Sequence, residues 1–508
     1  MKENIKYLIF CFLISACSVK KSASENTTTY KEAYRPQFHF TPKSSWMNDP
    51  NGLIYLNGNY HMFFQHNPDS TVWGPMHWGH AISKDLIHWD EQPIALFPDS
   101  LGWIFSGSAV YDENNTSGLG KEGKMPLVAI FTHHNRKLES EGRKDYQYQS
   151  LAYSLDEGKS WEKYEGNPVL KNPGIVDFRD PKVRWNVEVK KWIMTLATKD
   201  RITFYSSPNL IDWTKESEFG EKVGAHGGVW ECPDLFPMKV DGKEVWVLLV
   251  SINPGAPNGG SGTQYFIGDF DGKSFKPFNT KTKWIDYGTD DYAGVTFSNT
   301  DRLIFLGWMS NWQYAEKVPT EKWRSAMTLP RELSLEIVDD EFLLVNKPVK
   351  ELKKIIGKSK SSKNIQITDA LDLSADIAQA EGKFQLKFNS ATIQDYKIVL
   401  SNDNNEELII GYNKKDNQYF IDRQNARKEI FEKGFGAVHT APRLSRSTST
   451  DIELLFDAAS VEFFADGGLT AMTDIFFPTQ PFNKLQIKSK EGMLLRTLEI
   501  ASVQSIWN

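Results

Sequence analysis

A short apolar run with the character of a β-strand recurs five times along the chain. Helical periodicity is almost absent around these runs, which return roughly every 60 residues, a spacing typical of repeat architectures. The runs are residues 60–64, 126–131, 191–196, 244–249 and 301–306. In an all-β region, such a repeat indicates a propeller in which each unit forms one blade. The chain is therefore predicted to be all-β, with a five-bladed β-propeller over residues 36–338.

A second signal keeps a similar spacing. It places turn-forming residues a few positions before an aromatic residue, and such residues satisfy backbone amides where the chain reverses. The copies are residues 83–89, 154–161 and 207–213, with a weaker fourth copy at 269–275. We therefore expect each copy to be a tight turn that leads into the outer strand of a small antiparallel sheet.

The character of the sequence changes after the fifth unit. Residues 339–363, lysine-rich in their second half, are predicted to be a linker that includes a short helix. Apolar and polar residues then alternate over 384–388, 452–456 and 461–464, which is typical of half-buried strands. Residues 364–508 are predicted to form a β-sandwich. No catalytic constellation stands out there, so packing or ancillary sugar binding is its expected role.

Residues 1–17 resemble the signal peptide of a bacterial lipoprotein. Lys2 and Lys6 precede a short apolar run, and small residues come directly before Cys17. This order resembles a lipobox, whose cysteine carries lipid as the first residue of the mature chain; an ordinary signal peptide is the alternative. The run is too short to cross a bilayer. We expect an exported protein anchored to the cell envelope through Cys17, with residues 18–35 as a flexible tether.

Charge and cysteine content argue against two other classes of protein. The net charge is −6 and no basic block occurs, so nucleic acid is not an expected partner. If Cys11 leaves with the signal and Cys17 carries lipid, only Cys232 remains, and no intramolecular disulfide can form. Aromatic residues make up 13% of the chain, which fits either a large core or platforms for sugar rings.

Three acids occupy nearly the same place in three of the repeats. Asp49 and Asp180 each lie 11 residues before the apolar run of their unit, and Glu231 lies 13 residues before its run. Rotation about a propeller axis relates equivalent positions, so residues at the start of each innermost strand converge on one mouth of the central channel. The sequence therefore predicts an acidic cluster at that mouth.

Such a cluster has three uses. It could bind a hard cation, although the dense Asp and Asn spacing of calcium loops is absent from the repeats. Each acid could instead cap a local turn. Glycoside hydrolysis is the third use, because it needs one carboxylate as nucleophile or base and one carboxylic acid to protonate the leaving oxygen. Three acids in register favour hydrolysis, with no metal and no cofactor expected.

The motifs around these acids resemble those of glycoside hydrolase family 32, the invertase, inulinase and levanase family. They are WMNDPNG at 46–52, FSGS at 105–108, FRDP at 178–181 and ECPD at 231–234. The resemblance covers the whole mature chain in order, including the C-terminal sandwich. Several long motifs in register make it specific.

The resemblance implies a retaining mechanism on β-linked fructofuranosyl units. Asp49 would be the nucleophile that attacks the anomeric carbon. Glu231 would protonate the departing oxygen and then, as a base, activate water. Asp180 would bind sugar hydroxyls and stabilise the transition state, with Arg179 beside it. Asp49 would sit at the start of a rigid inner strand because a nucleophile must be held close to its target.

The same resemblance implies a set of substrate-binding residues. Short polar side chains would hold hydroxyl groups, and aromatic side chains would wall the fructosyl pocket; simple blade packing is the alternative for each aromatic. The set consists of Asn48, Gln65, Trp73, Phe105, Ser106, Arg179, Tyr292 and Trp308. Loops 135–149 and 253–262 are candidates for the wall beyond the first pocket.

Three other residues near the motifs receive no chemical step. His77 and His80 could suggest a metal pair, but no third ligand stands out, so we interpret both as structural. Cys232 follows the proposed acid directly and could affect it sterically.

The sequence thus predicts an exported, lipid-anchored enzyme that hydrolyses fructans and their oligosaccharides, with levan preferred over inulin. A sucrose-cleaving invertase or a fructosyltransferase is the alternative within the enzymes. A carbohydrate-binding propeller without catalysis is the alternative from another class. A related five-bladed fold cleaves arabinans or xylans by inversion, and the motif around Asp49 argues against it.

Overall fold

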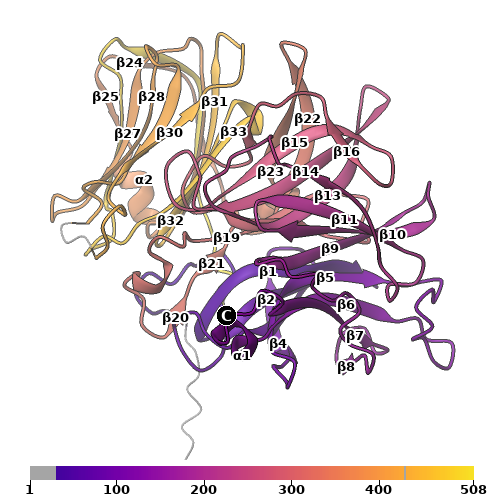
Figure 1. Cartoon of the computed structure of the whole chain (residues 1–508). Coiled ribbons are helices and arrows are strands. Elements are labelled where there is room, and N and C mark those ends of the chain that lie inside the picture. The colour runs from indigo at the N-terminus through magenta and orange to yellow at the C-terminus, as the bar shows by residue number, and fades with distance from the viewer. Residues whose placement is uncertain (1–29, 428–430, 508) are drawn as a thin grey trace, which may run out of the picture.

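The computed structural model describes residues 30–427 and 431–507, and strands make up most of their regular structure. Five small sheets come first along the chain, and two six-stranded sheets follow. Figure 1 shows the five sheets in indigo to pink beside the two sheets in orange and yellow. The fold is a five-bladed β-propeller followed by a β-sandwich, which confirms the predicted fold class.

Each blade is a small sheet whose main strands follow one another along the chain. Blade one holds β1 (Ser45–Leu56), β2 (Asn59–Asn67), β3 (His77–Ser83) and β4 (Trp89–Leu96), with β20 (Trp323–Arg324) parallel to β1. Blade two holds β5 (Trp103–Tyr111), β6 (Leu127–His134), β7 (Gln147–Ser154) and β8 (Glu162–Lys163). Blade three holds β9 (Phe178–Asn186), β10 (Lys191–Thr198), β11 (Arg201–Ser207) and β12 (Thr214–Phe219).

Blade four holds β13 (Val229–Val240), β14 (Lys243–Asn253), β15 (Gly262–Phe270), β16 (Phe275–Pro277) and β17 (Lys283–Trp284). Blade five holds β18 (Tyr292–Thr296), β19 (Ile304–Met309), β21 (Ala326–Met327), β22 (Arg331–Val338) and β23 (Glu341–Pro348). Short helices lie between strands: α1 (Arg136–Ser140), η1 (Ala315–Lys317) and η2 (Lys350–Lys354). The first strands β1, β5, β9, β13 and β18 contact their neighbours in a ring around the axis.

The five apolar runs of the sequence all fall on the second strand of a blade, namely β2, β6, β10, β14 and β19. A second strand lies between two others and has its faces covered by neighbouring blades, so it reads as a continuous apolar run. The repeated turns lie where they were expected, directly before the outer strands β4, β8, β12 and β16.

One turn geometry recurs at these places. Asp85 Oδ1 accepts the backbone N–H of Ile87 at 3.1 Å, and Asn209 Oδ1 accepts that of Ile211 at 3.1 Å. The following tryptophan donates its indole N–H to a carbonyl three residues earlier in three of the copies, at Trp89, Trp161 and Trp213. The aromatic residue of the repeat thus closes the turn that precedes it.

Every first strand departs from regular pairing with its second strand near its beginning. The register skips residues 48–49 in β1, 105–106 in β5, 180–181 in β9, 232–233 in β13 and 293–294 in β18. Bulges of this kind bend the strand and re-aim side chains. Asp180, Cys232 and Ala293 accordingly have positive φ angles of 64°, 43° and 54°. All five blades therefore have irregular backbone at the same end of the axis.

The propeller extends further along the chain than the sequence predicts. The segment 339–363 was expected to be a linker, but it contains β23, which pairs antiparallel with β22 along its whole length and ends blade five at Pro348. The tight turn at Asp339 and Asp340, both at positive φ, joins the two strands. Charged residues on either side of its apolar run 342–345 hide β23 in the sequence, although Leu343, Leu344 and Val345 are buried.

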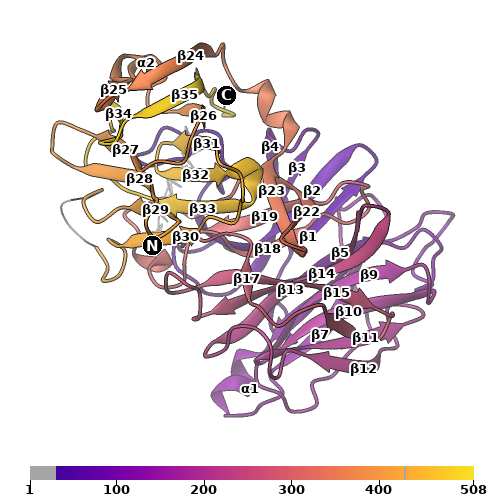
Figure 2. The same cartoon turned by 90° about the horizontal axis from the view of Figure 1, so that it is seen from above.

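The sandwich packs two six-stranded sheets around one apolar core (Figure 2). One sheet holds β24 (Lys360–Ile367), β26 (Phe384–Ser390), β31 (Thr450–Asp457), β32 (Ser460–Ala465), β33 (Thr470–Ile475) and β35 (Met493–Ser502). The other holds β25 (Ala370–Asp372), β27 (Tyr396–Ser401), β28 (Glu407–Asn413), β29 (Gln418–Asp422), β30 (Val438–Pro442) and β34 (Lys484–Lys488). Two short helices, α2 (Ser374–Gln379) and η3 (Asp466–Gly468), join strands.

Buried ion pairs join the propeller to the sandwich. Arg331 on β22 donates to Glu462 on β32 at 2.6 Å and to Asp286 at 2.8 Å. His39 lies between two sandwich carboxylates, with Nδ1 at 2.8 Å from Asp457 and Nε2 at 2.9 Å from Glu462. Buried charges of this kind require their partners, so the propeller is complete only with the sandwich in place.

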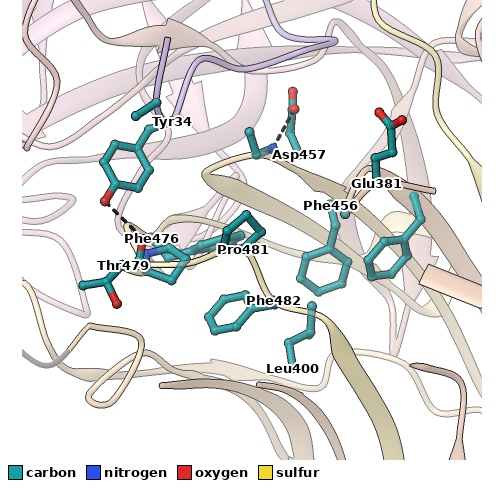
Figure 3. A pocket seen from close by; sticks show the side chains of 14 residues that line it. Tyr34, Glu381, Leu400, Phe456, Asp457, Phe476, Thr479, Pro481 and Phe482 are labelled. Atoms are coloured by element: carbon teal, nitrogen blue, oxygen red, sulfur yellow. Dashed lines mark hydrogen bonds between the residues drawn. The ribbon is translucent and has the colours of Figure 1, made fainter. Parts of the chain in front are cut away.

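The segment before β1 packs on the fold, although residues 18–35 were predicted to be a flexible tether. Tyr30 stacks on Trp507 with ring centroids 3.9 Å apart, and the Arg35 guanidinium lies 4.4 Å from the centroid of Trp323. Tyr34 donates its hydroxyl to Pro478 O at 3.1 Å, beside a cavity of about 240 Å³ on the sandwich (Figure 3). Two tyrosines and a buried arginine fix residues 30–35 there.

The predicted signal peptide, lipidation at Cys17 and the tether up to residue 29 lie outside the described residues. Within 30–427 and 431–507, no helix has the length and apolar character needed to cross a membrane.

Candidate active site

A cavity of about 230 Å³ opens where the bulges of the first strands meet. It is lined by nine of the predicted site residues, which are Asn48, Asp49, Gln65, Trp73, Phe105, Ser106, Arg179, Asp180 and Glu231. Six further residues complete its lining: His134, Glu139, Tyr146, Gln147, Asp177 and Trp312. The structure thus brings the three acids of blades one, three and four to one small space.

Asp49 is held by hydrogen bonds on both of its carboxylate oxygens. Ser106 Oγ of the next blade donates to Oδ2 at 2.8 Å, and Asn48 Nδ2 donates to Oδ1 at 3.0 Å. Trp46 Nε1 donates to Asn48 Oδ1 at 2.7 Å and so fixes the amide that holds the acid. Burial raises the pKa of Asp49, and the charge of Glu231 adds to the effect. The carboxylate is therefore oriented and poorly solvated.

Asp180 is the most deeply buried of the three acids, with a side chain that is 6% exposed. Its Oδ2 accepts the backbone N–H of Cys232 at 3.1 Å. Burial raises the pKa of Asp180 to about 7; Arg179 opposes the shift, and the charges of Asp49 and Glu231 add to it. Ionisation of Asp180 is therefore disfavoured by burial and by the charges of the other two acids.

Glu231 accepts hydrogen bonds from Arg179 and Tyr292. Arg179 Nη2 lies 2.8 Å and Nε 3.2 Å from Glu231 Oε1, and the Tyr292 hydroxyl donates to Oε2. Burial alone would lower the pKa of Arg179, but the charges of Glu231, Asp177 and Asp180 raise it well above its usual value. Arg179 therefore stays charged and fixes Glu231 from one side of the cavity.

Cys232 touches two of the acids. Its Sγ lies 3.4 Å from Asp49 Oδ2 and 3.6 Å from Asp180 Oδ2. Burial raises the pKa of the thiol well above its usual value, and the three nearby carboxylates raise it further. The thiol therefore stays protonated and separates two carboxylates as a small neutral side chain.

Two predicted binding residues lie behind the cavity wall instead of on it. Trp308 is fully buried, and Tyr292, 1% exposed, reaches the site through its hydroxyl on Glu231. Trp312 lines the cavity instead, and it packs on Trp46 and Trp308 with ring centroids 5.9 and 4.9 Å apart. A pattern of strands could not identify Trp312, because it lies in the irregular segment between β19 and η1.

One wall of the cavity comes from the segment around α1. Glu139 on this helix lies 3.2 Å from His134 Nε2, and His134 stacks on Phe105 with ring centroids 4.3 Å apart. Burial lowers the pKa of His134 to about 3, so the imidazole is neutral. Gln147 accepts the backbone N–H of Phe178 at 2.9 Å and ties this wall to blade three. The loop 135–149 singled out in the sequence therefore lies at the cavity.

The two histidines singled out in the sequence, His77 and His80, each have a protein partner. His80 is buried against His61, whose Nδ1 lies 3.2 Å from His80 Nε2, and His77 Nδ1 lies 3.0 Å from Pro75 O. Among residues 30–427 and 431–507, no group of three or more His, Cys, Asp or Glu side chains is arranged to hold a metal ion.

A closed ring of blades that ends in a small cavity with three carboxylates, an arginine and aromatic walls is the arrangement expected of a glycosidase. Residues 39–348 match the N-terminal domain of glycosyl hydrolases family 32, and residues 351–507 match the C-terminal domain of that family. The chain belongs to glycosyl hydrolase family 32, as its motifs predict.

Known proteins resemble this chain over nearly its whole length. The chain is 44% identical to a levanase of Bacillus subtilis (strain 168), covering 100% of this chain and 76% of the relative. It is 38% identical to an extracellular exo-inulinase of Aspergillus niger, covering 94% of this chain and 96% of the relative. The crystal structure of the exo-inulinase of Aspergillus awamori superposes with a TM-score of 0.85 at 37% identity, covering 94% of this chain and 100% of that one.

Proposed function

We propose that this enzyme cleaves β-fructofuranosidic bonds in fructans and fructooligosaccharides, with levan preferred over inulin. The observation that carries the proposal is the convergence of Asp49, Asp180 and Glu231 on one cavity from equivalent bulges of three blades. Similarity to a levanase and to exo-inulinases supports a fructan as the substrate.

The mechanism that we infer retains the configuration of the sugar. An oxygen of Asp49 attacks the anomeric carbon of the fructosyl unit, the glycosidic bond breaks, and Glu231 gives its proton to the departing oxygen. Water then attacks the same carbon, Glu231 takes the proton of that water, and the bond to Asp49 breaks. The hydrogen bonds of Ser106 and Asn48 hold the Asp49 carboxylate in the orientation that the attack requires.

Asp180 and Arg179 have supporting roles in this proposal. Asp180 accepts hydrogen bonds from ring hydroxyls and stabilises the positive charge that develops on the sugar ring. Arg179 is a positioning residue because it acts through Glu231, on which two of its nitrogens converge. Asn48, Gln65, Trp73, Phe105 and Trp312 surround the space that a fructosyl unit would occupy.

We further propose that the enzyme is exported and carries lipid at Cys17, since the small residues before that cysteine resemble a lipobox. Mass spectrometry of the mature N-terminus would test this. A mature chain that begins at Cys17 with lipid attached, and a Cys17→Ser variant without lipid, would support the anchor. Cleavage at another position without lipid would contradict it.

The central test of function compares substrates. Mature protein is incubated separately with levan, inulin, sucrose and arabinan, and the products are sized over time while the anomer first released is followed by NMR. Cleavage of levan ahead of inulin with first release of the β-anomer supports the proposal. Cleavage of sucrose alone would identify an invertase, longer fructosides as main products would identify a transferase, and first release of the α-anomer would overturn the retaining mechanism.

A further inference from the structure

The innermost strands of the propeller carry a second cavity at their other ends. It has a volume of about 220 Å³ and lies beside Tyr111, the last residue of β5, and Arg184, near the end of β9. The same strands carry Ser106 and Asp180 at the candidate active site. Four residues along a strand correspond to about 13 Å at the usual rise of a β-strand. The two cavities therefore open at opposite ends of the channel.

Arg184 is the unusual residue of this second cavity. Its Nε and Nη2 atoms are buried and have no hydrogen-bond partner among the described residues. Asp234 supplies the opposing charge that acts on Arg184; its Oδ2 accepts two hydrogen bonds from Thr296 and lies 3.3 Å from Lys182 Nζ, whereas its Oδ1 is buried and likewise has no hydrogen-bond partner among the described residues. Burial lowers the pKa of Arg184, and the charge of Asp234 opposes that shift. Buried donors are usually satisfied, and because Arg184 also lines the cavity, a rotation of its guanidinium would present an unused donor to a ligand there.

Aromatic rings and polar side chains complete the wall around Arg184. Trp185 and Trp192 lie edge to face with ring centroids 5.2 Å apart, and Trp192 Nε1 donates to Thr116 Oγ1 at 2.9 Å, which fixes its ring. Tyr111, which is half-buried, forms another part of the wall. Fixed rings beside hydrogen-bonding groups suit an amphipathic ring with an apolar face and a polar edge.

The charges at the cavity favour a neutral ligand over an anion. Asp112 and Glu113 line the cavity together with Arg184, so the carboxylates outnumber the guanidinium. Asp112 is fully occupied by Thr116 and Ser117, whereas Glu113 makes no side-chain hydrogen bond or ion pair among the described residues. A ligand must therefore accept hydrogen bonds from Arg184 and can donate to Glu113, as a sugar does and an inorganic anion does not.

We propose that this cavity is a second carbohydrate-binding site that holds one sugar unit of the polymer far from the catalytic acids. The cavity is smaller than the usual range of ligand pockets, about 300–1,000 Å³, which suits a single ring. Because the site lies at the opposite end of the channel, a long or branched chain can reach both cavities, whereas a trisaccharide reaches only one. The site therefore raises affinity for polymer without altering the chemistry. The choice of a fructan as the polymer rests on the proposed function.

Affinity electrophoresis in gels that contain levan or inulin tests this proposal. The parent protein is Glu231→Gln, which keeps the active-site cavity while slowing turnover. Arg184→Met and Trp185→Ala in that background should weaken retardation by about fivefold, as expected when the second contact of a two-site interaction is lost. Arg201→Met is the matched control, because Arg201 pairs only with exposed acids on the outer part of blade three.

Kinetics of the otherwise unaltered enzyme supply the second measurement. KM for polymer should rise by about fivefold in Arg184→Met and Trp185→Ala, while kcat/KM for a fructosyl trisaccharide should stay at the value of the unmutated enzyme. Unchanged retardation and unchanged KM in both variants would overturn the second site. If Arg184→Met does not fold, Trp185→Ala decides alone. An unmutated enzyme that cleaves no fructan would instead reject the proposed function, and retardation in an arabinan gel would then identify the polymer that the site holds.

Discussion

Arg179 contacts Glu231 Oε1 through two of its nitrogens, Nη2 at 2.8 Å and Nε at 3.2 Å. One edge of the planar guanidinium converges on this single oxygen while Tyr292 donates to the other, so the two neighbours together fix the orientation of the carboxylate, and a lysine could not reproduce the two-nitrogen contact. The acid assigned to proton transfer is therefore positioned by a neighbour that itself belongs to the FRDP motif.

Replacement of Arg179 should therefore reduce turnover strongly. Arg179→Met leaves Glu231 with Tyr292 as its side-chain partner, and we expect kcat/KM on fructan to fall by about 10²–10³-fold, the usual effect of removing one preorganised group. Steady-state kinetics would show it, with Arg201→Met as the control. Activity within a factor of a few of the parent would show that Arg179 does not position the acid.

Loss of Asp49 and loss of Glu231 should differ in their dependence on the leaving group. Glu231→Gln should lose about 10²–10⁴-fold on fructan, as is typical when a general acid is removed. It should still release an activated aryl alcohol from an aryl β-fructofuranoside, because that leaving group needs little protonation. Asp49→Asn should lose both activities. Rate measurements on the two substrates decide, and the opposite pattern would exchange the two roles.

Asp180→Asn should make the protein more stable at neutral and alkaline pH while abolishing activity. Burial raises the pKa of Asp180 from 3.8 to about 7, so the folded state binds this proton more tightly than the unfolded state. Stability is therefore lost as pH rises between these two values and stays low above them. The variant lacks that loss, so its Tm advantage should be small at pH 4 and full at pH 8.

Calorimetry or a thermal melt at both pH values would measure the effect of Asp180→Asn. Asp241→Asn, at an exposed turn, is the control. An advantage of equal size at pH 4 and pH 8 would contradict the explanation by buried charge. Stabilisation on loss of a catalytic group is expected where a site holds like charges together.

The tryptophans Trp308 and Trp312 should respond differently to substitution. Trp308 is fully buried, so Trp308→Ala should cost about 3–5 kcal/mol of stability, as large core truncations do. Trp312 lines the cavity, so Trp312→Ala should raise KM with a smaller loss of stability. Denaturant melts and steady-state kinetics on both variants would measure this. A larger rise in KM for Trp308→Ala and a larger loss of stability for Trp312→Ala would show that Trp308 belongs to the pocket wall.

The propeller–sandwich interface should weaken as pH rises above neutrality. Burial disfavours the charged form of His39, but Asp457 and Glu462 outweigh it and raise the pKa to about 9. A raised pKa gives stability that is fully present below the unfolded value of 6.5 and is lost as pH rises through 9.

His39→Gln should therefore destabilise the protein most at pH 6 and least at pH 10. Thermal melts at the two values would measure it, with the exposed His88→Gln as the control. A destabilisation of the same size at both values would mean that His39 contributes packing and no charge.

Periodicity accounts for most of what the sequence could predict. The apolar second strands and the turns that precede the outer strands have signatures of their own, and the acids could be placed by their distance from those strands. Of the hairpin of β22 and β23, the strand β23 was missed because charged residues on either side of its apolar run make it resemble a linker. The tether prediction was wrong for residues 30–35, since the contacts of Tyr34 and Arg35 lie more than 280 residues away.

The remaining gap concerns the direction of side chains. A count of residues could not show that residues 48–49 and 180–181 leave the regular ladder, and this departure decides which side chains meet at the axis. The resemblance to the family pointed to Trp308, on β19, and did not include Trp312, in the irregular segment that follows. The roles assigned to the site residues stay predictions until the variants are measured.

The parallel pairing of β1 with β20 affects how the enzyme comes into being. Ser45 and Trp46 at the beginning of β1 pair with Trp323 and Arg324, so the strand that carries Asp49 is among the first parts made and acquires this neighbour on its inner side much later. A ribosome adds Trp323 and Arg324 only after about two-thirds of the 508 residues have been joined. Shorter nascent chains lack the parallel partner of the strand that carries Asp49, so the first blade is completed only after part of each of the five blades has been made.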